Sequence, residues 1–222
     1  MKETELAKPV IAWLTKQHWE VYQEVQFSYG GGIADIVAVR HGILWIIETK
    51  TTFGFAVLNQ ASRWLAHYRS VAVPFSRQRD YRVALHYYRV GVIEVGEFQD
   101  CEVYEHIPAP LVRMNHERSK RYIDSLVELQ KTYAEAGSRS GSHLTPYKNT
   151  MIEVRKIISS NPGCTVKYLY ERLGKMHYGS PQSFKGNLHK ALIDFEKDWC
   201  EVKTDTRPYT FFCKEISQEG LL

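Results

Sequence analysis

Two strand-forming runs separated by only two residues constrain this chain most. They are IADIVAVR (33–40) and ILWIIETK (43–50), and both are rich in the Ile and Val that strands favour. His41-Gly42 between them has the length and composition of a tight hairpin turn. The pattern therefore predicts two buried, adjacent strands that run in opposite directions.

The segments around this hairpin alternate between helical and strand-like patterns. Residues 20–27 alternate as a strand does, whereas Leu6, Val10, Trp13 and Leu14 recur at helical spacing. We expect further strands near 71–74 and at 91–95, and helices from Thr4 or Glu5, over about 56–69, near 79–89 and near 116–135. This order predicts an α/β domain with a central mixed sheet flanked by helices.

A second domain is expected beyond a polar linker. Residues 136–147 read AGSRSGSHLTPY, without a hydrophobic period, and separate a domain at 1–135 from one at 148–222. In the second domain we predict helices over about 148–160, from Thr165 and from Ser180, and then a hairpin of 200–203 and 209–214. Three helices and a hairpin in about 70 residues are the plan of a winged helix.

Composition excludes some classes of protein. The 222 residues are 44% hydrophobic and 24% charged, and no apolar run approaches the roughly 18 residues that span a bilayer. The polar N-terminus lacks the pattern of a secretory signal, so we expect a cytoplasmic protein, with association with the nucleoid left open. The four cysteines form no CxxC pair and are interpreted as reduced thiols. No membrane contact and no small-molecule cofactor are expected.

The basic residues are concentrated toward the C-terminus. Residues 1–135 hold 16 Lys and Arg against 16 Asp and Glu, whereas residues 146–222 hold 12 against 9. This excess weakly indicates contact of the second domain with nucleic acid.

The predicted hairpin carries three residues that point to chemistry. Asp35 lies in its first strand, and Glu48 and Lys50 lie two apart in the second, so these two share a face of the sheet. Buried carboxylates are unfavourable unless a cation satisfies them, and Mg²⁺ held by carboxylates can promote phosphodiester hydrolysis. Lys50 would stabilise charge on the phosphate or orient water, and the carbonyl of Thr49 is a candidate third ligand.

These residues resemble the motif of the PD-(D/E)xK nuclease superfamily, with Ala34 in place of the leading proline. The resemblance covers roughly residues 3–95, and the opening segment ETELAKPVIAWLTKQHWEVYQEV is similar to MmcB-like and related restriction-endonuclease-like families. It implies a restriction-endonuclease-like fold and assigns Glu5 as a further metal ligand. Gln60 and Trp64 are similar to a glutamine and an aromatic residue beside the active site of several such nucleases, which makes Gln60 a candidate phosphate-contacting or supporting residue.

Each assignment has a plainer alternative. Glu5 could simply offset the helix dipole, and Gln60 could belong to a polar helix face. Glu24 could point into the site, but a solvated position on the strand is favoured.

The third helix of the second domain and the hairpin tip supply candidate contacts to DNA. They are Gln182, Ser183, Lys185, Asn187, His189, Lys190 and Arg207. A winged helix can also dock onto protein, so this alternative stays open.

The sequence thus predicts a Mg²⁺-dependent DNA endonuclease, in which Mn²⁺ can replace Mg²⁺ and a winged helix positions the catalytic domain. Its domain order also resembles that of transposon end-cleaving endonuclease subunits. The alternative is a non-catalytic DNA-binding adaptor built on a nuclease-like scaffold. A protein partner and a homodimer are both left open.

Overall fold

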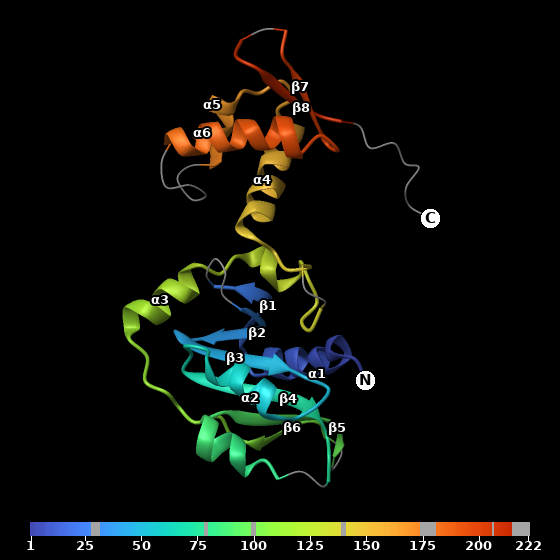
Figure 1. The fold of residues 1–222 in the computed structure, drawn as a ribbon, viewed down its shortest axis with the longest axis vertical. Helices are drawn as coiled ribbons and strands as arrows, with labels where there is room; N and C mark the ends of the chain where they lie inside the picture. Colours follow the sequence, from blue (N-terminus) through green and yellow to red (C-terminus); the bar gives the residue numbers. More distant parts are fainter. Residues whose placement is uncertain are drawn as a thin grey trace. The chain divides into compact units, whose positions relative to one another are not determined.

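The structure is a computed structural model that describes residues 1–27, 32–77, 80–98, 101–138, 141–173, 181–205 and 207–214 (Figure 1). The chain divides into two compact units, Met1–Leu144 and Thr145–Leu222. In the described part of the chain, no helix is long and apolar enough to cross a bilayer.

The N-terminal unit is built on a six-stranded mixed sheet whose strands lie in sequence order. The strands are β1 (Glu20–Gln26), β2 (Ile33–Arg40), β3 (Ile43–Thr49), β4 (Tyr68–Pro74), β5 (Gly91–Phe98) and β6 (Cys101–Ile107). Strands β3, β4 and β5 are parallel, and the other neighbours are antiparallel. The predicted α/β architecture with a central mixed sheet flanked by helices is confirmed.

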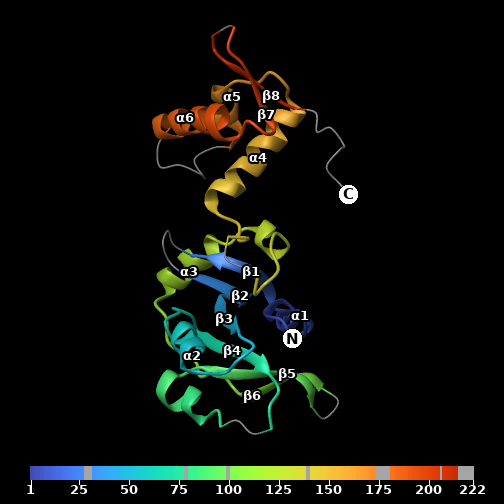
Figure 2. The same cartoon turned by 45° about the vertical axis from the view of Figure 1, so that its right-hand side comes forward.

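Two helices cover opposite faces of this sheet, as the two views show (Figures 1 and 2). Helix α1 (Glu3–Lys16) buries Leu6, Val10 and Leu14 in a cluster with alternate residues of β2 and β3. Helix α2 (Phe55–Ser62) packs its apolar side with Val71 and Val73 of β4, which point to the other face. Alternate residues of each strand thus contribute to the two cores on opposite faces of the sheet. A polar side chain on the α2 face, such as that of Glu48, is therefore buried.

Several predicted helices are shorter than their sequence patterns suggested. The helix expected over 56–69 ends at Ser62, and its expected last residues, from Tyr68, belong to β4. The 79–89 helix is reduced to a π-helical turn, η1 (Ala84–Tyr88), and the 116–135 helix divides into α3 (His116–Asp124) and the 3-10 turn η2 (Glu128–Lys131). Strand β6 was not predicted, since its sequence CEVYEHI is too polar to indicate a buried strand.

The segment expected to begin the linker belongs to the N-terminal unit. Ala136 is buried in the α1 core cluster. The side chain of Gln23 donates to the carbonyl of Lys131 at 2.6 Å and accepts from the amide of Ala136 at 3.0 Å. These contacts attach residues 131–136 to β1, and the two units divide at 144/145, within the predicted linker 136–147.

The C-terminal unit contains helices followed by a hairpin, in the predicted order. Its elements are α4 (Pro146–Ser160), α5 (Val166–Leu173), α6 (Pro181–Lys190), which continues into the π-helical turn η4 (Ala191–Phe195), β7 (Cys200–Lys203) and β8 (Thr210–Cys213). Leu169, Leu188 and Phe211 are fully buried in one core that these elements share. The predicted N-cap at Ser180 lies outside the described residues. Cys200 and Cys213 face each other across the hairpin as free thiols.

Candidate functional site

Three neighbouring strands place a carboxylate each in one row across the sheet. The antiparallel register of β2 and β3, continued by one pair, sets Asp35 opposite Glu48. Glu24 lies beside Asp35 from β1, where its φ of +51° interrupts the regular strand. Residues in such opposed positions have Cβ atoms roughly 5 Å apart and share a face of the sheet. This face is the one that α2 covers, because Glu48 pairs with Val71 of the α2 cluster.

Asp35, in the middle of the row, is held by Thr49. The backbone amide and the hydroxyl of Thr49 both donate to Oδ2 of Asp35, at 2.7 and 2.8 Å. Burial raises the pKa of Asp35 above its ordinary value, and these two hydrogen bonds only partly oppose that rise. Thr49 therefore lies beside Asp35, as expected. It contacts Asp35 through its amide and hydroxyl, whereas the sequence pointed to its carbonyl as a metal ligand.

Glu48 is fully buried, and residues of the α2 segment hold both of its oxygens. Gln60 donates from Nε2 to Oε2 at 2.6 Å, and the indole N–H of Trp64 donates to Oε1. Burial and then the neighbouring charge of Asp35 raise the pKa of Glu48 to about 9. The structure thus brings Gln60 of α2, and Trp64 just beyond the helix, to the same carboxylate.

Glu24 completes the row at β1 and is 4% exposed. Its Oε1 accepts from the amides of Gly137 and Ser138, at 2.8 and 3.3 Å. Burial and then the charge of Asp35 raise the pKa of Glu24 to about 7. The favoured expectation of a solvated Glu24 is therefore wrong. Its burial depends on a segment more than 110 residues away in sequence, which no local pattern around β1 could indicate.

Lys50 follows β3 and meets the first turn of α1. Its Nζ donates to both carboxylate oxygens of Glu3, at 2.9 Å each. Burial alone would lower the pKa of Lys50, but the hydrogen bonds and charge of Glu3, and then the charges of Asp35 and Glu48, raise it above its ordinary value. The ammonium group is therefore retained beside the carboxylates.

The helix-one acid at the site is Glu3, not the expected Glu5. Glu5 is exposed and accepts from the backbone amide of Lys2 at 2.8 Å, which closes a capping box at the start of α1. Glu5 thus takes the helix-terminal role that was its alternative. Glu3 and Glu5 are two residues apart, so their side chains lie on different sides of the first helical turn. Only Glu3 is on the side that meets Lys50.

The donor set suits a hard divalent cation. Asp35, Glu48 and Glu24 offer carboxylate oxygens, the ligands that Mg²⁺ and Mn²⁺ prefer, and their mutual repulsion would be relieved by a cation. In the ranges that the structure describes, no three His, Cys, Asp or Glu side chains already form a metal-binding group. Protein donors engage both oxygens of Glu48, so coordination by Glu48 would require Gln60 or Trp64 to release an oxygen.

Among the candidate DNA contacts whose side chains the structure describes, all but His189 are exposed. Ser183, Lys185, Asn187, Lys190 and Arg207 are exposed. His189 is only half-exposed, because its ring stacks on Tyr209 with centroids 5.3 Å apart. The side chain of Gln182 lies outside the described residues.

Comparison with known proteins leaves the chain without a family. No protein-family model and no curated protein matches the sequence. Among solved structures it is similar to SPO1766, a protein of unknown function from Silicibacter pomeroyi. The two share 16% identity and a TM-score of 0.42, over 56% of this chain and 83% of that one.

Proposed function

We propose that the N-terminal unit is a metal-dependent nuclease that hydrolyses phosphodiester bonds in DNA. The observation that carries this proposal is the row of Glu24, Asp35 and Glu48 on three adjacent strands, with a charged Lys50 at its end. Each carboxyl has a raised pKa, which means that the fold places these groups where their ionised forms are unfavourable. Perturbed pKa values of this kind cluster at functional sites.

The three carboxylates would hold Mg²⁺ or Mn²⁺, with the carbonyl of Thr49 as a further candidate ligand. When bound, the cation supplies charge that polarises a phosphoryl oxygen and lowers the pKa of a bound water. Lys50 would stabilise negative charge on the phosphate in the transition state. Glu3 positions the ammonium group of Lys50, and Gln60 and Trp64 orient Glu48.

We further propose that the C-terminal unit is a winged helix that binds DNA. In support, Lys185 and Lys190 lie exposed on α6, and Arg207 lies exposed beside the hairpin. Cations on a helix and on an adjacent hairpin can meet phosphates on either side of a groove. The unit would then position the nuclease on its substrate.

A non-catalytic adaptor is the second candidate, and one observation favours it. Both oxygens of Glu48 and one of Asp35 already accept hydrogen bonds from protein donors, and Lys50 is already paired with Glu3. A scaffold that has lost its reaction could retain such a closed set of contacts. The two candidates differ in whether a divalent cation enters the site.

Cleavage assays on single-stranded, duplex, nicked and branched DNA, and on RNA, separate the two candidates. We expect DNA cleavage with Mg²⁺ or Mn²⁺, binding without cleavage with Ca²⁺, and no cleavage in EDTA. Equal cleavage in EDTA would refute the metal mechanism. Binding of DNA with no cleavage under any cation, and no thermal stabilisation by Mn²⁺, would establish the adaptor instead.

A further inference from the structure

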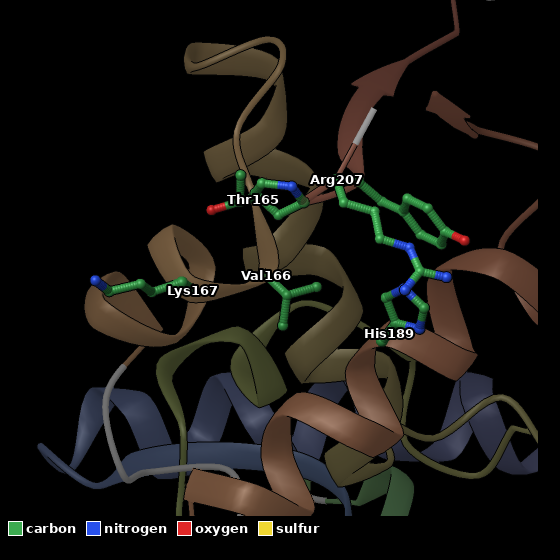
Figure 3. Close-up of a pocket in the computed structure, with 7 residues that line it drawn as sticks. Thr165, Val166, Lys167, His189 and Arg207 are labelled. Carbon is green, nitrogen blue, oxygen red and sulfur yellow. The ribbon is translucent and has the colours of Figure 1, made fainter. Parts of the chain in front are cut away.

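The C-terminal unit contains a cavity of about 520 Å³ that is separate from the carboxylate row (Figure 3). It lies where the start of α5, the end of α6 and the residues just before β8 meet. Its lining is Thr165, Val166, Lys167, His189, Arg207, Pro208 and Tyr209. Cavities of this size accept small organic groups, and the lining shows which kind.

One part of the lining is cationic. The guanidinium of Arg207 points toward the ring of His189, whereas Lys167 extends to the other side (Figure 3). Lys167 already has a partner, because its Nζ lies 4.0 Å from a carboxylate oxygen of Glu171. Within the described residues, no carboxylate lies within ion-pair distance of Arg207. The guanidinium carbon of Arg207 lies 6.0 Å from the centroid of the Tyr209 ring. That contact neutralises no charge, so Arg207 remains the cation for an anionic ligand.

The other part of the lining is aromatic and apolar. The rings of His189 and Tyr209 stack with an interplanar angle of 20°, and His189 meets the buried Phe211 edge-on at 6.3 Å. Phe211 is fully buried in the core of the unit, so it supports His189 from beneath. Val166 and Pro208 add apolar surface to the same cavity. A planar ring can pack against such a wall without losing hydrogen bonds to water.

A nucleotide combines these two chemistries. Its phosphate carries the negative charge that an arginine fork binds in bidentate fashion, and its base is a flat ring that stacks on aromatic side chains whatever its identity. A phosphate alone would use only Arg207 and leave the apolar wall uncovered. An uncharged aromatic compound would leave Arg207 without an anionic partner.

We propose that this cavity binds one unpaired nucleotide of a DNA strand, with the phosphate at Arg207 and the base against Tyr209 and Pro208. The nucleotide must be unpaired, because a base inside a duplex is stacked on its neighbours and cannot enter a cavity. This inference rests on the proposed DNA binding by the C-terminal unit, and it specifies that frayed ends, flaps or gaps are preferred over continuous duplex.

The first experiment titrates thymidine 5′-monophosphate into the full chain and follows the ring signals of His189 by NMR. Thymidine and inorganic phosphate serve as the two half-ligands. We expect the nucleotide to bind more tightly than either half. Because a charge-assisted hydrogen bond is lost, Arg207→Gln should weaken nucleotide binding by about tenfold or more.

Lys203→Gln is the matched control for this variant. Lys203 lies in β7 of the same hairpin and approaches the ring of Phe212 at 4.6 Å, but it does not line the cavity. Lys203→Gln removes one positive charge from the same hairpin, as Arg207→Gln does. It should keep the nucleotide affinity within about twofold of that of wild type, because exposed charges contribute little. Equal losses in the two variants, or no change of the His189 signals with the nucleotide, would overturn the proposal.

A second experiment separates this proposal from the proposed function. Wild type and Arg207→Gln are compared on a blunt duplex and on the same duplex with three unpaired nucleotides at one end. Preference for the frayed duplex that disappears in Arg207→Gln supports the cavity as the site of the unpaired strand. Equal binding of both duplexes by wild type overturns it while leaving DNA binding intact. Tight nucleotide binding without binding of either duplex would instead refute DNA binding and the strand-borne ligand, and leave a free nucleotide as the occupant.

Discussion

The two units of this protein place their charged side chains in opposite environments. The N-terminal unit encloses carboxylates in its sheet, and Glu24 and Glu48 are nearly or fully buried. The C-terminal unit leaves its cations on the surface, where Lys185 and Lys190 are exposed. Enclosed charges lower the stability of the metal-free protein, whereas exposed ones change it little. Only the first arrangement therefore demands an explanation beyond solubility.

The difference also bears on what each unit can do. Carboxylates held on three neighbouring strands have little freedom to move, and reacting groups need such fixed positions. Exposed lysines move freely and suit contacts with phosphates that carry no sequence information. The proposed division into a cutting unit and a binding unit follows from this contrast, and substitutions in either unit can test it.

The largest effect is expected on cleavage. Asp35→Asn and Glu48→Gln each remove a carboxylate from the proposed metal site, so each should reduce the cleavage rate by about 100-fold or more. Lys50→Ala should reduce the rate similarly, because the negative charge of the transition state loses the stabilisation that Lys50 provides. Glu5→Gln is the control, because a glutamine there still closes the capping box and should cleave as wild type does. Cleavage by the two acid variants at the wild-type rate would remove the catalytic assignment.

The next effect is on the stability of the metal-free protein. The pKa values of Glu24 and Glu48 are raised to about 7 and about 9, so between about pH 4.5 and 9 the folded state binds more protons than the unfolded state. The free energy of unfolding in EDTA should therefore fall as pH rises through this window, by up to about 1.4 kcal/mol per pH unit for each of the two groups.

Glu48→Gln should flatten this fall and raise the melting temperature at pH 8 in EDTA, while removing the stabilisation by Mn²⁺. Asp35→Asn should also melt higher without metal, because it relieves the repulsion with both neighbours. Urea unfolding at several pH values measures both effects, with the exposed Glu117→Gln as the control. If the acid variants melt lower than wild type, the carboxylates are structural.

A smaller loss of stability is expected where residues 136–138 cross the site. Gly137 has a φ of +77°, and a Cβ there would lie 2.8 Å from the carbonyl carbon and the Cβ of Glu3. Gly137→Ala should therefore destabilise the N-terminal unit by roughly 1–3 kcal/mol, through backbone strain and overpacking. Thermal melting measures this, and Gly141→Ala is the control, since φ is also positive there but nothing lies within 4 Å of the added Cβ.

The smallest effect is expected in the C-terminal unit. Lys190→Gln should weaken DNA binding only a few-fold and reduce the slope of log affinity against log salt by about 0.9, since one phosphate contact is lost. Lys156→Gln is the control, because Lys156 is paired with Glu153 on α4 at 2.7 Å. Fluorescence anisotropy across a salt series gives the slope. If both variants keep the wild-type slope, α6 does not face DNA and a protein-docking role for this unit gains support.

The sequence by itself determined the elements that depend on nearby residues. The hairpin of β2 and β3 follows from two apolar runs and a two-residue turn, and its register already sets Asp35 near Glu48 and Lys50. The helices and hairpin after residue 145 are likewise local patterns, with caps and turns that can be read directly. Gln60 and Trp64 were expected on one helical face, but α2 ends at Ser62, so Trp64 reaches Glu48 from beyond the helix.

Only the tertiary structure decided which distant residues complete the site. Glu24 is buried because residues 136–138 fold back onto β1. The packing of α1 places Glu3, and not Glu5, against Lys50. The cavity at Arg207 likewise joins residues of α5, α6 and the hairpin. Side-chain periodicity specifies which face of a helix or strand is apolar. The free energy of packing these elements together determines which other elements that face contacts.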